Sequence, residues 1–176
     1  MKYLIMTEGT CEKAFLDVLL EKNILLFEVN DLLYEEIFKA RQLEQSLISK
    51  INQLPLNEKV TIIRIGDKLS DELRIPLDVK NKVVSIEKVC IKPEFEILYI
   101  IWNNEVEKYN KQKSNEKPSE YIYHIIDDYQ KSYKYNYEFF SNLTEKELKF
   151  LIKQYDIKRL GTHTSFEKSL LSIIKN

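Results

Sequence analysis

The stretch KYLIMTEGTCEKAFLDVLLEK, residues 2–22, contains a short apolar run, a polar turn and an amphipathic segment in direct succession. The run at residues 2–6 predicts a buried strand that ends in the turn at residues 7–10. Apolar side chains then recur at helical spacing, which predicts a helix over residues 12–22 with Thr10 as its N-cap. This succession is the first sign of a sheet whose strands alternate with helices.

The same alternation continues through the first half of the chain. The further elements predicted there are strands at residues 24–29, 60–65 and 83–86 and a helix from about residue 38 to residue 53. Largely apolar strands that alternate with helices favour an α/β fold, with a mostly parallel sheet of about four strands and helices on both faces. Ligands of such sheets collect beyond the carboxyl ends of the strands. Glu8 and Asp67 each lie just past the end of a predicted strand.

The second half of the chain is predicted to be mostly helical. Helix starts are expected at Pro93, Pro118, Thr144 and Thr164, the last two as capping boxes. The apolar stripe that follows Pro93 continues to Tyr109. We therefore expect an α/β domain at residues 1–105 and a helical extension at residues 106–176. Because the extension has apolar faces to bury, we expect it to pack on the domain and to wall one side of the ligand cleft.

The composition excludes several classes of protein. The chain has 176 residues, of which 44% are hydrophobic and 31% charged, and this suffices for a real core. With 27 Lys and Arg against 28 Asp and Glu, the net charge of -1 excludes a globally basic nucleic-acid binder. The 3 glycines are isolated, which excludes the glycine-rich loops of P-loop and dinucleotide-binding proteins. The 2 cysteines lie far apart and form no CxxC pair.

The sequence also predicts where in the cell the protein is located and which kind of metal ion it could bind. No stretch reaches the roughly 18 apolar residues of a membrane helix, and the N-terminus lacks the apolar segment of a signal peptide. We expect a cytoplasmic protein with no membrane partner and with Cys11 and Cys90 as free thiols. Because the chain has only 2 histidines, a divalent metal would be held mainly by carboxylates, which suits Mg²⁺ or Mn²⁺.

Two acidic segments at strand ends are candidates for a metal or catalytic site. Glu8 lies on a strand-to-helix turn, where Gly9 allows close approach of a ligand, although a solvated turn is the simpler interpretation. Asp67 and Asp71 would share one face if the chain turned into a helix there. The alternative for Asp71 is a cap of the next helix.

A third acidic segment and a group of lysines complete the candidates. Glu94 and Glu96 lie in the first turn of a predicted helix, where acids fit the helix dipole without any function. The functional alternative is that one of them reaches across to the cleft of Glu8 and Asp67.

Lysines interleaved with tyrosines are candidates for contacting a nucleic-acid backbone, with a half-buried tyrosine face as the alternative. Lys113, Lys131 and Lys134 belong to this stretch, and the nucleic-acid contacts are expected from Lys131 and Lys134, with Lys13 and Lys68 from the two acidic segments.

Three segments, taken in order, resemble a known family. Residues 4–16 (LIMTEGTCEKAFL) resemble the opening of Toprim domains, where a strand ends in a catalytic Glu followed by Gly and then a helix. Residues 62–67 (IIRIGD) resemble the later strand that ends in the Toprim Asp-x-Asp. Residues 93–98 (PEFEIL) resemble the Pro-x-Phe-Glu-hydrophobic segment of the RloB-like (AbiL-type) Toprim proteins, with a looser similarity over residues 117–135. The second aspartate of the Asp-x-Asp is missing, because Lys68 and Leu69 follow directly.

This resemblance implies a Toprim, Rossmann-like sheet and Mg²⁺-dependent cleavage of phosphodiester bonds in DNA or RNA, within a bacterial anti-phage or abortive-infection system. It implies that Glu8 is a metal ligand or a general acid-base, and that Asp67 holds the metal with Asp71 or Glu96. Nucleic acid is the implied partner, and a companion protein such as an ATPase is a further one. Because the Asp-x-Asp is incomplete, the alternative is a non-catalytic Toprim-like subunit that senses or binds a partner protein.

Overall fold

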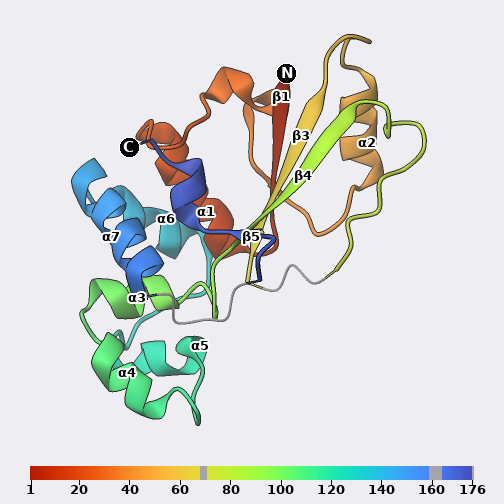
Figure 1. Ribbon diagram of the computed structural model, residues 1–176. Helices are drawn as coiled ribbons and strands as arrows, with labels where there is room; N and C mark the ends of the chain where they lie inside the picture. The colour runs from red at the N-terminus through yellow and green to blue at the C-terminus, as the bar shows by residue number, and fades with distance from the viewer. Residues whose placement is uncertain (68–70, 159–163, 176) are drawn as a thin grey trace.

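One open sheet of five parallel strands organises the computed structural model of the protein, which describes residues 1–67, 71–158 and 164–175 (Figure 1). The strands lie in the order β2-β1-β3-β4-β5, and every neighbouring pair is parallel. Their bounds are β1 Lys2–Thr7, β2 Phe38–Lys39, β3 Val60–Gly66, β4 Val83–Cys90 and β5 Glu167–Lys168. The α/β fold with a parallel sheet is therefore confirmed, with five strands rather than about four.

Helices of the described residues precede, separate and follow these strands. The α-helices are α1 Thr10–Glu21, α2 Gln45–Asn52, α3 Ile97–Trp102, α4 Val106–Gln112, α5 Pro118–Tyr121, α6 Tyr133–Ser141 and α7 Glu145–Lys158. The short 3-10 helices are η1 Val29–Asp31, η2 Leu33–Glu35, η3 Ile122–His124 and η4 Leu170–Ile173. Helices after β4 dominate the second half of the chain, as the sequence predicts.

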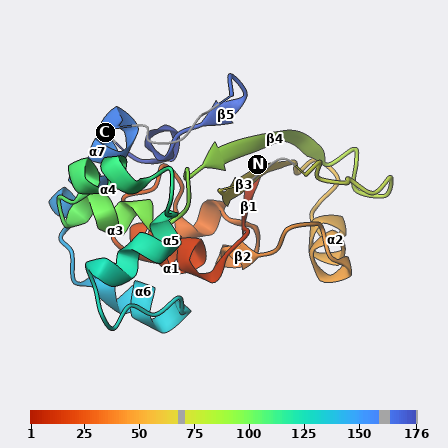
Figure 2. The same cartoon turned by 90° about the horizontal axis from the view of Figure 1, so that it is seen from below.

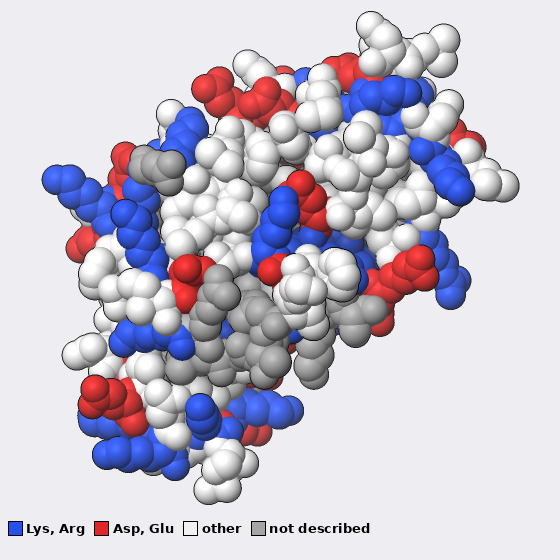
Figure 3. All heavy atoms as spheres, viewed as in Figure 1, with Lys and Arg blue, Asp and Glu red and all other residues white. Residues whose placement is uncertain are grey.

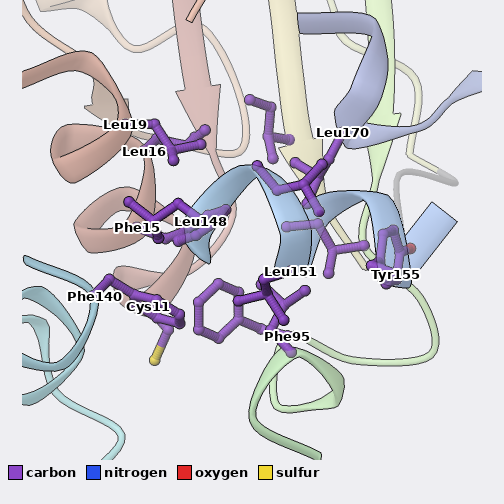
Figure 4. Close-up of a cluster of buried hydrophobic side chains, with 14 of the residues drawn as sticks. Cys11, Phe15, Leu16, Leu19, Phe95, Phe140, Leu148, Leu151, Tyr155 and Leu170 are labelled. Carbon is purple, nitrogen blue, oxygen red and sulfur yellow. The ribbon is translucent and has the colours of Figure 1, made fainter. Parts of the chain in front are cut away.

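A separate hydrophobic cluster lies on each face of the sheet. Successive strand residues point to opposite faces, so Ile5 and Ile63 enter one cluster while Leu4 and Ile62 enter the other. The first cluster lies beneath α1, α3, α6 and α7, and Figure 4 shows its side chains from these elements interdigitating. The second, smaller cluster lies beneath α2. Helices therefore cover both faces of the sheet.

The strand order creates a crevice at one edge of the sheet. The connection from β1 runs through α1 on one face, and the connection from β2 runs through α2 on the other (Figure 2). Leu73 and Val79, which follow β3, also join the cluster on the face of α2, so a crevice forms between the carboxyl ends of β1 and β3. The pairing of β1 with β3 runs from Lys2 opposite Val60 to Thr7 opposite Ile65. Both strands therefore end at the same edge.

Two predictions about the first half of the chain are wrong. Residues 24–29 form no strand: Leu25 makes a single antiparallel bridge to Ile174, and only Ile24, Leu25 and Phe27 are buried in the core. The strand beside β1 is β2, where Phe38 lies opposite Met6, at the start of the predicted helix. A two-residue strand is too short to leave an alternating pattern in the sequence, and its place is set by pairing alone. The helix α2 begins only after it.

Helix boundaries also differ from the predictions, for local reasons. The first helix begins at Thr10 with Gly9 as its N-cap, so Thr10 is not the cap. The helix predicted over residues 93–109 is divided into α3 and α4, because Asn104 adopts a φ of 60° that interrupts it. After Pro118 the helix α5 has only 4 residues before the chain continues into η3.

The two predicted capping boxes are followed by different secondary structures. At Thr144 the backbone N–H donates to the Glu147 carboxylate at 2.7 Å, and α7 follows as predicted. At Thr164 the backbone N–H also donates to Glu167 at 2.7 Å. The chain then enters β5 instead of an α-helix, because pairing with β4 extends the backbone at this point.

The chain after residue 105 contributes to both the sheet and the core. The strand β5 pairs with β4 at Lys88 and Val89, and the Lys92 ammonium lies 2.7 Å from the Glu167 carboxylate across the same junction. The helix α6 packs on α1, and α7 packs on α3. Side chains of α6 and α7 belong to the same hydrophobic cluster as those of α1.

Charges of both signs are spread over the surface. Figure 3 shows lysine and arginine side chains interspersed with aspartate and glutamate on the face viewed in Figure 1. This distribution agrees with the net charge of -1. None of the described helices is both long and apolar enough to cross a membrane.

A buried lysine holds the end of α2 against the start of β4. Lys82 is only 5% exposed, and its ammonium donates to the carbonyl oxygens of Ile51, Asn52 and Leu54 at 3.2, 2.8 and 2.6 Å. The last carbonyls of a helix have no partner within the helix, and a cation there also complements the helix dipole. One side chain thereby satisfies three backbone acceptors.

We predict that Lys82→Met, which keeps the apolar stem and removes the donors, lowers the free energy of unfolding by about 2–3 kcal/mol. The measurement is urea denaturation of the full chain. Lys80→Met serves as the matched control, because Lys80 is exposed and two residues away. Equal urea midpoints for the two variants would contradict this role of Lys82.

Candidate functional site

A cavity of about 470 Å³ lies at the carboxyl edge of the sheet, next to the crevice between β1 and β3. Its walls come from five parts of the chain: the β1–α1 turn, the end of β2, the end of β3, the segment that precedes α3 and the segment that precedes α6. The charged residues that line it are the acids Glu8, Glu12, Asp67, Glu94 and Glu96 and the bases Lys39, Arg41 and Lys131. Carboxyl groups therefore outnumber cations in the pocket.

Backbone geometry at the strand ends places Glu8 beside β3. The Glu8 N–H donates to the Ile65 carbonyl at 3.0 Å, which extends the β1–β3 pairing by one residue. The Glu8 carboxylate then lies against Gly66, where a Cβ atom would collide with it. Gly66 directly precedes Asp67, so both acids lie at the same end of the β1–β3 pair. The glycine is needed here because the carboxylate approaches the backbone closely.

Glu12 on the first turn of α1 is a buried carboxyl group, only 7% exposed. Its pKa is raised to about 7, chiefly by burial and also by the nearby charges of Asp67 and Glu96. A hydrogen bond from its own backbone N–H and the Lys131 ammonium act in the opposite direction. A carboxyl group with this pKa exists in both protonation states near neutral pH, as a general acid-base requires.

Glu96 is the most deeply buried acid of the pocket, at 1% exposed. One carboxylate oxygen accepts hydrogen bonds from the Tyr129 hydroxyl at 3.2 Å and the Lys131 ammonium at 2.8 Å. The other oxygen, Oε2, is buried and has no partner among the described residues. Glu94, by contrast, accepts a hydrogen bond from the Ser119 N–H at 3.0 Å, a bond that holds α5 in place.

Cys11 also lines the pocket but is not suited to be a nucleophile. Burial raises the pKa of its thiol to about 11, and the charges of Glu12 and Glu96 act in the same direction. The thiol accepts a hydrogen bond from the Asn136 amide at 3.3 Å, and Asn136 in turn accepts one from the Tyr99 hydroxyl at 2.9 Å. Only the thiolate attacks electrophiles. The cysteine therefore joins α1 to α6.

The structure brings four of the predicted site residues together. Glu8, Asp67, Glu96 and Lys131 all line the pocket, although they come from distant parts of the sequence. Lys131 is paired with Glu96, which occupies its ammonium.

The other predicted site residues lie elsewhere or outside the described residues. Asp71 lines a different hollow, and the chain from Asp71 to Lys82 forms turns and irregular structure. Lys13 pairs with Asp17 at 2.7 Å on α1. Lys134 is exposed and lies 3.8 Å from Glu138. Lys68 lies outside the described residues.

Three further residues of the pocket were not predicted as site residues from the sequence. Glu12 follows Glu8 by one helical turn, which is a usable signal, but an acid in a first helical turn is equally explained by the helix dipole. Lys39 and Arg41 lie at the end of the two-residue strand β2, for which the sequence shows no pattern.

The five acids surround the pocket and do not converge on one point. Among the described residues, no group of three His, Cys, Asp or Glu side chains is placed to hold a metal ion by itself. Mg²⁺ is commonly bound by one or two carboxylates, with water and substrate phosphate as its other ligands.

The fold and the site define a doubly wound α/β protein with an acid-rich pocket at its switch point, the place between β1 and β3 where the strand order reverses. Comparison with family models, with curated proteins and with solved structures finds no match for the chain.

We predict that the stability of the protein falls as the pH rises from about 4.5 to 7, because Glu12 binds its proton more tightly in the folded state than in the unfolded state. Glu12→Gln removes this effect. The variant is expected to match the wild type at pH 4 and to be more stable by about 2–3 kcal/mol at pH 8. Urea denaturation at both pH values measures the difference.

Glu107→Gln, which removes an exposed carboxylate from α4, is the control for this experiment. It is expected to give the same difference from wild type at both pH values. A Glu12→Gln variant no more stabilised at pH 8 than at pH 4 would show that the Glu12 carboxyl group is not held protonated in the folded protein.

Proposed function

We propose that the protein is a divalent-metal-dependent phosphodiesterase, a nuclease of the Toprim type, that cleaves DNA or RNA at the pocket between β1 and β3. The observation that carries this proposal is the meeting of Glu8 and Asp67 at the ends of two paired strands, in a pocket that also holds the unpartnered Glu96 Oε2. Ligand sites of doubly wound sheets lie at this position.

The residues of the pocket fit a hard divalent cation. Carboxylate oxygens are the ligands that Mg²⁺ and Mn²⁺ prefer, and a buried carboxylate oxygen without a partner calls for a cation or a donor. Glu8 and Asp67 would hold the ion, with Glu96 as a further ligand from the opposite wall. When bound, such an ion supplies positive charge that offsets the charge developing on a phosphate under attack.

Glu12 supplies the acid-base chemistry in this proposal. Its pKa of about 7, set by burial and by the charges of Asp67 and Glu96, leaves it partly protonated at neutral pH. The protonated form can donate to the oxygen that leaves the phosphorus, and the ionised form can take a proton from the attacking water. Glu8 holds the metal, so the two acids of the β1–α1 turn have separate roles.

The cellular setting is part of the same proposal. A cytoplasmic location is supported by Cys11 and Cys90, which are both buried and both free thiols. A role in bacterial defence and a companion protein such as an ATPase follow from the resemblance to RloB-like proteins. Nucleic acid is the partner that the pocket itself supports.

We predict that Asp67→Asn lowers Mn²⁺ affinity by at least about 10-fold and cleavage of nucleic acid by more than about 100-fold, because it removes a metal ligand. Calorimetric titration with Mn²⁺ and a cleavage assay on single-stranded DNA and RNA measure the two effects. Asp71→Asn is the matched control: Asp71 lies outside the pocket, so this variant is expected to bind and cleave as the wild type does.

The same titration tests the second candidate function, a non-catalytic Toprim-like subunit. This alternative is favoured by the absence, among the described residues, of three converging metal ligands. A wild-type protein that binds no Mn²⁺ and cleaves nothing would contradict the enzyme and support the subunit. Mn²⁺ binding that survives in Asp67→Asn would show that the assigned ligands are wrong.

A further inference from the structure

Two cations in the pocket have no partner among the residues that the structure describes. Three basic side chains line the cavity, and one of them, Lys131, is paired with Glu96. Among the described residues, neither the Lys39 ammonium nor the Arg41 guanidinium makes an ion pair or a hydrogen bond. This is unexpected beside five carboxyl groups, because a flexible cation close to a carboxylate normally pairs with it. Both cations are therefore available to a bound anion.

The two unpaired cations of the pocket come from a different element than its carboxyl groups. Lys39 and Arg41 come from the end of β2, the edge strand beside β1, whereas Glu96 and Lys131 come from the segments before α3 and α6. Figure 2 shows β2 next to β1, with α1 beside both strands. We name the region of Lys39 and Arg41 the basic side of the pocket and the region of the carboxyl groups the acidic side.

The backbone that carries the basic side is fixed from both neighbouring strands. The Ala40 N–H donates to the Thr7 carbonyl of β1 at 3.0 Å. The Arg64 guanidinium of β3, only 2% exposed, donates to the carbonyl of Arg41 at 3.3 Å and to that of Asp71 at 2.6 Å. The two side chains therefore extend from a rigid strand end.

A second tie lies one residue further along. The Gln42 side-chain amide donates to the Glu72 carbonyl at 3.1 Å and accepts a hydrogen bond from the Arg74 N–H at 3.0 Å. The segment after β2 is thereby joined to the segment that follows Asp67. These two hydrogen bonds therefore fix the position of the basic side relative to residues 72–74.

From this arrangement we propose that Lys39 and Arg41 form an anion subsite, which binds a phosphate of the nucleic-acid strand next to the phosphate that is cleaved at the acidic side. The proposal rests on the function proposed above. A guanidinium binds phosphate oxygens through two parallel hydrogen bonds, and a neighbouring ammonium adds a second charge. The cavity of about 470 Å³ has the size of a small-ligand site, so it receives a strand segment and not a duplex.

The test is the salt dependence of nucleic-acid binding by the double variant K39Q/R41Q. The probe is a short fluorescent single-stranded oligothymidylate, and binding is followed by anisotropy between about 50 and 200 mM salt, once with Ca²⁺ and once with a chelator. The matched control is K80Q/R74Q, which removes the same charge from two exposed residues outside the pocket.

We expect the wild type and K80Q/R74Q to bind with the same salt slope. K39Q/R41Q is expected to bind at least about 10-fold more weakly at low salt, with a slope smaller by about 1.4, because each phosphate contact on a single strand contributes about 0.7. An unchanged slope and affinity in K39Q/R41Q would overturn the subsite, and so would a wild type that does not bind the probe in either condition.

Calorimetric titration with Mn²⁺ separates this inference from the proposed function. If the subsite is correct, K39Q/R41Q keeps the Mn²⁺ affinity of the wild type, because neither residue is a metal ligand. Loss of Mn²⁺ binding in this variant would overturn the division into a basic and an acidic side. Probe binding that depends on Lys39 and Arg41 while the wild type binds no Mn²⁺ would support the subsite and reject the metal site.

Discussion

The parallel pairing of β1 with β3 is the interaction on which the rest of the structure depends. Its register, with Thr7 opposite Ile65, makes both strands end at the same edge of the sheet. Both strands are buried between the two hydrophobic clusters, one on each face of the sheet. Side-chain packing on both faces therefore fixes the pairing of the strands. Because α1 packs on one face and the described residues after β3 pack on the other, a crevice forms at this edge. Acids placed directly after these strands must therefore meet in one crevice.

Desolvation gives this crevice its chemistry. In water the carboxyl groups of Glu12 and Glu96 would be ordinary anions, but both lie in the protein interior with other acids nearby. Burying such groups costs folding free energy, and the surrounding hydrophobic cluster must offset that cost. The result is a pocket in which one acid holds a proton near neutral pH and another presents a buried oxygen without a partner among the described residues. The unpartnered oxygen favours a cation or a hydrogen-bond donor, and the protonated acid can donate a proton.

The sequence predicts the parts of the site that depend on local pattern. Glu8 and Asp67 could be located because each follows an apolar run long enough to be recognised as a strand. Asp71 was assigned through a helical spacing that requires a helix, and the chain there is irregular. Glu12 and Lys39 depend on tertiary structure: the first on burial, the second on a two-residue strand that exists only through pairing with β1. Such strands and such burial leave no periodic signal in the sequence.

The helical extension, residues 106–176, supplies part of the site and is therefore not a separate unit. Glu96 comes from the segment before α3, but both hydrogen-bond donors to its Oε1, Tyr129 and Lys131, come from the segment before α6. Without them the carboxylate would be buried with two unpaired oxygens, at a cost of several kcal/mol for an uncompensated charge. The same segments bury their apolar faces on α1, which carries Glu12. The acidic pocket and the extension therefore depend on each other for stability, so the site is a property of the whole chain and not of its first half alone.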